Sequence, residues 1–216
     1  MKIDILTLFP EMFSGPFTWS IVKRAKEKKI VDIKIFDIRD WATDRYKSVD
    51  DKPYGGGAGM VMRVDIIDKA IESLRVEEFK SKSKIVLLDA GGERYTQKKA
   101  GELAKNKHLV IICGHYEGVD YRVHEHIADE IISIGDYVLS GGEIPAMAIV
   151  DSVVRLLPGA LGNEKSLAEE SHNNEEVEYP QYTRPEEYKG WKVPDVLLTG
   201  DHRKIQEWRK DGLHKT

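Results

Sequence analysis

Cysteine is almost absent: the chain of 216 residues has only one, Cys113. A single cysteine excludes an internal disulfide and a metal site built from several thiolates, and it favours a reducing compartment, the cytoplasm. Long apolar runs are also missing, so no segment is a candidate membrane span. The N-terminal segment carries Asp4 and Glu11 within its apolar stretch, which is not the pattern of a signal peptide.

Neither positively nor negatively charged residues are in large excess. The chain has 33 Lys and Arg against 37 Asp and Glu, a net charge of -4. Any surface for nucleic acid must therefore be a local patch. Hydrophobic residues make up 41% and charged residues 32%, which excludes disordered and collagen-like chains. The length suits one large domain or two small ones with a real core.

What is present is an alternation of strand and helix patterns. Unbroken apolar runs at 85–88 and 109–113 predict strands in a parallel sheet that is covered on both faces. Further strands are predicted at 3–9, 33–36 and 130–134, and helices at 17–28, 64–79, 97–107 and 145–157. The order predicts an α/β fold with a mostly parallel sheet and helices on both faces. The helix at 145–157 is apolar nearly all round, which places it in a core or at a subunit interface.

The composition changes after Pro158. Residues 162–188 hold eight acidic and two basic residues, which is typical of a linker. We therefore expect a domain at 1–160, a linker at 161–192 and a small C-terminal helical segment at 193–216. That last segment is too short to hold a core alone.

Glycines follow three of the predicted strands. Ligands bind beyond the carboxyl ends of strands in open α/β sheets, so three such loops predict one cofactor pocket rather than ordinary turns. The glycines concerned are Gly91, Gly92, Gly114, Gly118, Gly135, Gly141 and Gly142. A dinucleotide fingerprint and a phosphate-binding P-loop are both absent. The run Gly55–Gly59 could be a hinge or a phosphate contact.

Metal ligands and nucleophiles are not favoured by the pattern. His124 and His126 are two residues apart, on different sides of a helix, and are interpreted as solvated histidines. Cys113 ends an apolar strand and is interpreted as a core residue.

Several long segments resemble the bacterial tRNA (guanine-N1)-methyltransferase family, TrmD. They follow the family's order through essentially the whole chain. They are LTLFPEMF at 6–13, VDDKPYGGGAGMVM at 49–62, CGHYEGVDYRV at 113–123, SIGDYVLSGGEIPAMAIVDSVVRLLPGALGN at 133–163, YPQYTRPEEYKGWKVPDVLLTGDH at 179–202 and WR at 208–209.

The resemblance implies a fold and an activity. The family's sheet carries a deep trefoil knot that binds S-adenosylmethionine, and the family methylates N1 of the guanine at tRNA position 37, beside the anticodon. It works as a homodimer with the active site at the subunit interface, and a C-terminal helical domain holds the anticodon stem-loop. A requirement for Mg²⁺ is left open.

The resemblance also implies three cofactor loops: Leu87 with the residues after it, Gly114 to Glu117, and Ser133 to Gly142. Glu117 would lie near the charged part of the cofactor; its alternative is a solvated loop carboxylate. The implied cofactor residues are Leu87, Gly114, Tyr116, Glu117, Ser133, Ile134, Gly135, Asp136, Tyr137, Val138, Leu139, Gly141, Gly142 and Pro145.

Guanine N1 carries a proton, so the chemistry needs a base and a cation near O6. The resemblance implies Arg155 as the cation; its alternative is a residue favoured by the helix dipole. The family usually has an aspartate before a serine as the base, and here Glu170 precedes Ser171. Glu169 is a competitor for that role.

The family generally continues beyond the Trp-Arg pair, whereas this chain stops at Thr216. We interpret this as a trimmed chain or an incomplete RNA-holding domain. Two other hypotheses stay open: a non-catalytic RNA-binding module that keeps the fold, and a knotted methyltransferase for another RNA position or a small molecule.

Overall fold

The computed structural model describes residues 1–74, 83–161, 176–177, 179–212 and 214–215. The chain forms two compact units, Met1–Gly162 and Asn163–Thr216, which are described separately below. The domain and linker limits expected from the composition stay a prediction. Among the described residues, no helix is both long enough and apolar enough to cross a membrane.

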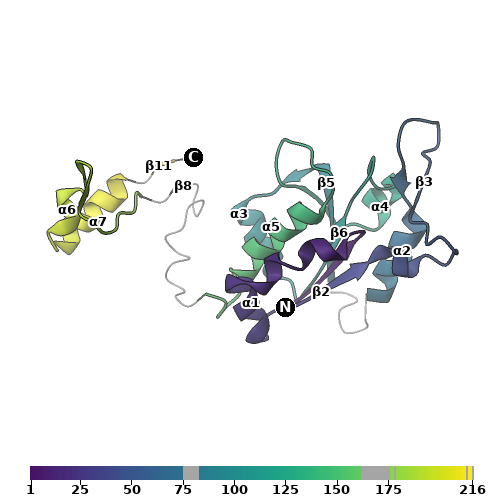
Figure 1. The fold of residues 1–216 in the computed structure, drawn as a ribbon, viewed down its shortest axis with the longest axis horizontal. Coiled ribbons are helices and arrows are strands. Elements are labelled where there is room, and N and C mark those ends of the chain that lie inside the picture. The colour runs from purple at the N-terminus through teal and green to yellow at the C-terminus, as the bar shows by residue number, and fades with distance from the viewer. Residues whose placement is uncertain (75–82, 162–175, 178, 213, 216) are drawn as a thin grey trace. The chain divides into compact units, whose positions relative to one another are not determined.

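The first unit is built on a five-stranded sheet in the order β2-β1-β6-β5-β7 (Figure 1). All four pairings are parallel, and the central strands β1 and β6 are almost entirely buried. This confirms the predicted α/β class with a mostly parallel sheet. In sheet order the strands are β2 (Asp32–Asp37), β1 (Lys2–Thr7), β6 (His108–Cys113), β5 (Ser83–Arg94) and β7 (Glu130–Ser133).

Helices cover both faces of this sheet because side chains alternate along the buried strands. Ile3 and Ile5 of β1 belong to one hydrophobic cluster, and Leu6 belongs to the other. On one side of the sheet lie α1 (Ser20–Glu27), α3 (Gln97–Leu103) and α5 (Glu143–Val154), and on the other lie α2 (Val64–Leu74) and α4 (Tyr121–His126) (Figure 1).

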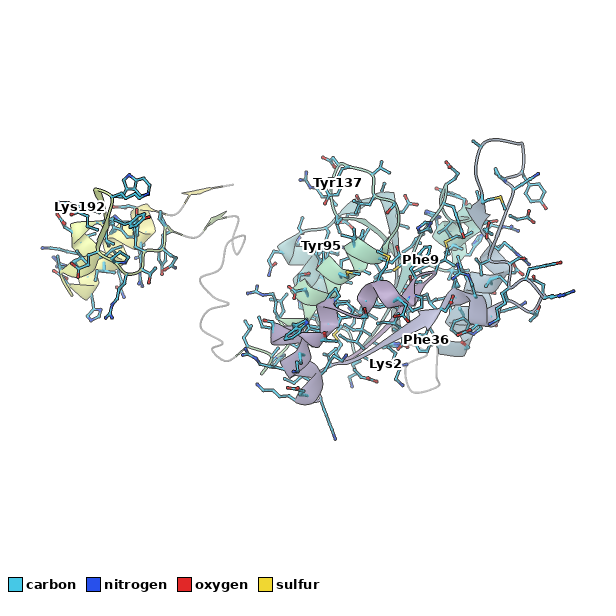
Figure 2. The ribbon with its side chains drawn as sticks, in the orientation of Figure 1. Lys2, Phe9, Phe36, Tyr95, Tyr137 and Lys192 are labelled. Atoms are coloured by element: carbon cyan, nitrogen blue, oxygen red, sulfur yellow. The ribbon has the colours of Figure 1, made fainter. Side chains whose placement is uncertain are left out.

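Helix ends differ from the predicted ones by a few residues. The segment before α1 is a short 3-10 turn, η2 (Pro16–Thr18), and α5 begins two residues earlier than predicted. The predicted end of the helix at 64–79 lies outside the described residues. Tyr95 directly follows β5 (Figure 2), and its hydroxyl lies 2.6 Å from the Ser152 hydroxyl of α5.

The glycine pair at 91–92 was expected in a loop after a strand, and this is wrong: both residues lie within β5. Leu88 and Glu93 both face Ile132 of β7, so the four residues between them bulge out of the ladder. A Cβ on Gly92 would lie 2.6 Å from the Ile131 carbonyl carbon. Glycine is therefore required where the two strands approach most closely.

The smaller elements complete the chain. In the first unit, the 3-10 turns η1 (Pro10–Phe13) and η3 (Ile38–Trp41) follow β1 and β2, and β3 (Asp50–Asp51) pairs with β4 (Val61–Met62). The second unit holds the hairpin β9 (Glu187–Tyr188) and β10 (Trp191–Lys192), the helices α6 (Asp195–Leu198) and α7 (His202–Asp211), and the pair β8 (Glu176–Val177) and β11 (His214–Lys215).

Candidate active site

A pocket lies where the bulge of β5, the loops after β6 and β7, and the start of α5 come together. These segments lie near the carboxyl ends of neighbouring parallel strands, which is where ligands bind in open sheets. The lining residues are Leu88, Asp89, Ala90, Gly114, His115, Tyr116, Glu117, Gly118, Ile132, Ser133, Ile134, Tyr137, Val138, Leu139, Ser140, Gly141, Gly142 and Pro145.

The loop after β6 turns sharply. Tyr116 has a φ of 61° and Gly118 a φ of 128°, so two residues of this short loop lie at positive φ. The Glu117 amide donates to the Met60 carbonyl at 3.0 Å, and the Glu117 side chain packs against Gly59. Glu117 is thus held by the Gly-rich segment while it remains exposed to solvent.

The start of α5 is fixed against the end of β6. The Gly142 amide donates to the Gly114 carbonyl at 2.9 Å. A Cβ on Gly142 would lie 2.6 Å from the Cys113 Cα, so only glycine allows this approach. Gly141 forms a backbone bridge with His115, which joins the loops after β6 and β7.

The loop after β7 is closed by short hydrogen bonds. The Ser133 hydroxyl donates to the Gly135 carbonyl at 3.0 Å, and the Tyr137 amide donates to the same carbonyl at 2.9 Å. Beyond this turn, Tyr137 and Val138 are 55% and 85% exposed and form part of the pocket wall. Adjacent exposed apolar side chains at the wall of a pocket are typical of a ligand-binding surface.

Most of the residues implied as cofactor contacts line this pocket. Leu87 does not: it is fully buried in the cluster beside α2, and its neighbour Leu88 lines the pocket instead. Successive side chains of a strand point to opposite faces, which explains the difference. Gly135 and Asp136 also lie outside the lining, and Asp136 pairs with Arg94 at 3.5 Å.

Seven further residues line the pocket without being singled out as contacts. His115 and Ser140 fall within implied loops, and Gly118 is one of the glycines expected at the pocket. Only Ile132 lies outside the segments that the sequence indicated, and strand alternation was the signal that could have found it. The seven are Leu88, Asp89, Ala90, His115, Gly118, Ile132 and Ser140.

His124 corrects a further expectation, since it is not a solvated histidine. Its side chain is 15% exposed, stacks on the Tyr121 ring and lies 3.4 Å from the Asp89 carboxylate at the pocket wall. His126 is 71% exposed, as expected for a solvated residue. In the part of the chain that the structure describes, no group of three or more His, Cys, Asp or Glu is placed to hold a metal ion.

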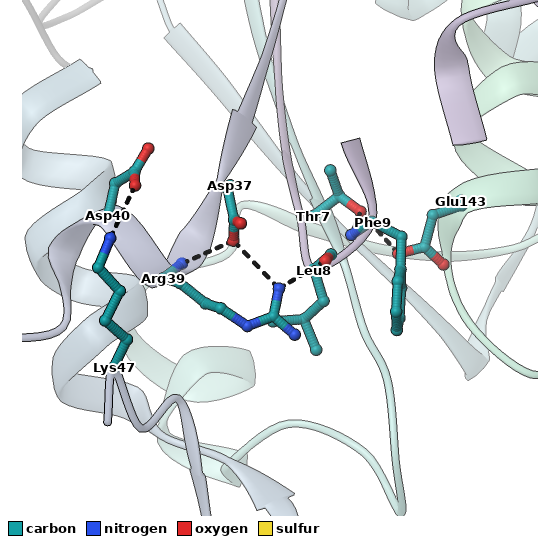
Figure 3. Close-up of polar contacts among 8 residues, drawn as sticks. All are labelled: Thr7, Leu8, Phe9, Asp37, Arg39, Asp40, Lys47 and Glu143. Atoms are coloured by element: carbon teal, nitrogen blue, oxygen red, sulfur yellow. Dashed lines mark hydrogen bonds and ion pairs between the residues drawn. The ribbon is translucent and has the colours of Figure 1, made fainter. Parts of the chain in front are cut away.

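A buried polar pair supports the pocket from behind. The Thr7 hydroxyl donates to the Glu143 carboxylate at 2.7 Å, and both residues are buried (Figure 3). Nearby Cys113 is fully buried, which confirms it as a core residue. Burial, and then the charge of Glu143, raise the pKa of the Cys113 thiol well above its usual value, so it is not a reactive thiolate.

The implied catalytic residues are not brought together among the described residues. Arg155 is the half-buried residue that caps the C-terminus of α5, and it does not line the pocket. Glu170 and Glu169 lie outside the described residues. Their roles stay predictions.

Comparison with known proteins identifies the family. The family model for tRNA (Guanine-1)-methyltransferase TrmD matches residues 1–216. The chain belongs to the TrmD family. Similar relatives are the tRNA (guanine-N(1)-)-methyltransferases of Geobacillus kaustophilus (strain HTA426) and Bacillus cereus (strain AH820), which are 57% and 54% identical. Each alignment covers 100% of this chain and 88% of the relative.

The resemblance found in the motifs is thus confirmed. TrmD proteins are methyltransferases, which implies S-adenosylmethionine as the methyl donor. The pocket described above is lined by residues of the family motifs.

Proposed function

We propose that this chain transfers a methyl group from S-adenosylmethionine to N1 of the guanine at tRNA position 37, beside the anticodon. Membership of the TrmD family supports tRNA (guanine-N1)-methyltransferase activity directly. The observation in the structure that supports it best is one pocket formed by three segments of the family motifs.

The residues present fit the methyl donor. Leu88, Ile132 and Leu139 offer apolar walls for a purine ring, and the glycine-bearing turns expose backbone groups that can hydrogen-bond to it. Asp89 and Glu117 add carboxylates in the same pocket for a positively charged ligand. S-adenosylmethionine would supply a methyl group activated by its bond to a positively charged sulfur.

The chain's own residues would prepare the guanine. The proton on N1 makes that nitrogen a poor nucleophile, so a carboxylate must remove it, and we propose Glu170 for this role. We propose Arg155 as the cation that stabilises the negative charge on O6. Both roles rest on the family motif positions that Glu170 and Arg155 occupy.

The finer features of the family complete the proposal. We propose that the parallel sheet carries the trefoil knot and that two chains form a homodimer with the active site at their interface. The second unit would hold the anticodon stem-loop, and it offers the basic helix α7 with Arg203, Lys204, Arg209 and Lys210 for contacts with phosphates.

Methyl transfer from labelled S-adenosylmethionine to unmodified tRNA tests the activity, and primer extension on the product maps the modified base. We expect incorporation of label and a stop at position 37. Incorporation with a stop elsewhere would assign a different RNA position. No incorporation, with tRNA still bound, would favour a non-catalytic RNA-binding module.

A further inference from the structure

A carboxylate is buried directly behind the pocket wall. Glu143 is the first residue of α5 and is only 2% exposed. It does not line the pocket itself, but its neighbour Gly142 does. A buried carboxylate is costly unless it is stabilised, so its position calls for an explanation.

The contacts of Glu143 lead to the pocket on one side and to β1 on the other. One of its oxygens accepts from Thr7, whose hydroxyl in turn accepts from the Phe9 amide at 2.9 Å (Figure 3). The other oxygen lies where a Cβ on Gly141 would stand, next to the His115 ring. Glu143 therefore lies directly behind the residues that line the pocket.

Among the residues that the structure describes, the buried Glu143 forms no ion pair. The neighbouring His115 accepts from the Tyr116 amide through Nδ1 at 2.9 Å, so this nitrogen is engaged within its own loop. The N-terminus of α5 and the Thr7 hydroxyl stabilise the carboxylate, but they carry only partial charges.

We propose that Glu143 is a specificity residue that makes the pocket prefer the sulfonium form of the methyl donor to the thioether that remains after transfer. This inference rests on the proposed function, since it assumes that the pocket holds this donor. Donor and product differ by one methyl group and one positive charge. A fixed negative charge behind the wall attracts the donor and no longer attracts the sulfur of the product.

The size of the effect follows from electrostatics. A unit charge acting over about 10 Å, at the effective dielectric constant of about 20 that suits protein sites, changes a dissociation constant by roughly tenfold. A purely structural role would instead weaken the donor and the product equally. The ratio of the two dissociation constants therefore separates the two roles.

The test measures both dissociation constants by titration calorimetry, with S-adenosylmethionine and with S-adenosylhomocysteine, on the full chain. Glu143→Gln keeps the shape and an oxygen that accepts from Thr7, but it removes the charge. We expect the preference for the sulfonium ligand to fall about tenfold. The control is Asp68→Asn, which removes one charge from an exposed position of α2, away from the pocket, and should leave the ratio unchanged.

A second variant covers the case in which Glu143→Gln does not fold. Thr7→Val combined with Glu143→Met replaces the donor and the acceptor of their mutual hydrogen bond with apolar groups of similar shape, and only the partly buried Phe9 amide loses an acceptor. It removes the same charge, so the same fall in the ratio is expected.

An unchanged ratio in the folded variant, or an equal loss of affinity for both ligands, would overturn the inference. If the unsubstituted chain binds neither ligand, the proposed function fails as well. If it binds both and the variant keeps its ratio, only the role of Glu143 fails.

Discussion

Gly141 and Gly142 are neighbours in the pocket wall, yet a side chain would meet different surroundings at each. A Cβ on Gly141 would meet the side chains of Glu143 and His115. A Cβ on Gly142 would meet the backbone of Cys113 and Gly114. Side chains can rotate away, whereas the backbone at the end of a buried strand cannot, so the two substitutions should have different consequences.

Leucine at Gly141 should abolish binding of S-adenosylmethionine and leave the fold intact, because the new side chain displaces pocket residues that can move. Calorimetry for binding and circular dichroism for the fold would check this. Gly142→Ala is the contrasting variant: it should lower the free energy of unfolding by about 1–3 kcal/mol in urea. Unchanged affinity in Gly141→Leu would remove this turn from the cofactor site.

Glu170 gives the sharpest prediction on catalysis. Glu170→Gln keeps size and hydrogen bonding but cannot accept the N1 proton, so single-turnover methylation should slow by roughly 10²–10⁴. Cofactor affinity should hardly change. The matched control is the neighbouring Glu169→Gln, which should have little effect. If only Glu169→Gln loses activity, the base is Glu169 and not Glu170. If neither variant loses activity, the carboxylate mechanism is wrong for this chain.

At the scale of elements, one lysine joins α3 to two strands. Lys99 lies 3.1 Å from Glu93 of β5, 3.2 Å from Glu130 of β7 and 3.4 Å from Glu102. Burial alone would lower the pKa of Lys99, but these carboxylates outweigh it and raise that pKa. Burial would likewise raise the pKa of Glu130, and the hydrogen bonds from Lys84 and Lys99 lower it instead.

Lys99→Met should therefore destabilise the fold by about 1–3 kcal/mol at pH 7, because Glu130 loses one of its two partners. A lowered carboxyl pKa contributes stability that is present above the unfolded value and is lost as the pH falls through the folded value. The difference between the unsubstituted chain and the variant should thus shrink as the pH falls below about 4.5. Urea unfolding of both proteins at pH 7 and pH 3 measures this difference in the free energy of unfolding.

The control for this prediction is Lys98→Met, since Lys98 is an exposed neighbour on the same helix. Its effect should stay within about 0.5 kcal/mol at both values of pH. A constant loss of stability in Lys99→Met at both values would mean that packing of the lysine, and not its charge, holds α3 against the strands.

The strands were the most predictable elements, and the bulge of β5 the least. Unbroken apolar runs revealed β5 and β6 because both strands are covered on two faces. Nothing in the sequence fixes the register shift after Leu88, because it depends on pairing with β7, far along the chain. The same shift brings Asp89 to the pocket wall as part of a bulge within β5, whereas the sequence indicated a loop after the strand.

At the scale of the whole molecule, the outer face of α5 bears on how the chain assembles. This helix buries Ala146, Ile149 and Val153 against the sheet, which matches the core role expected for it. Its other face carries Ile144, which is 49% exposed, and the exposed residues Ala148 and Asp151. The spacing of four and three residues places these on one stripe, next to the pocket wall that begins the helix.

We expect this stripe to meet a second copy of the chain, as the proposed homodimer requires. Sedimentation equilibrium at micromolar concentration should give about twice 24.6 kDa. Ala148→Arg places a long charged side chain in the middle of the stripe and should give the monomer mass, since a charge without a partner is costly to bury. Asp68→Arg, on an exposed position of α2, introduces the same side chain elsewhere and should leave the dimer intact. A mass near 24.6 kDa for the unsubstituted chain would contradict the dimer, and with it an active site shared between two subunits.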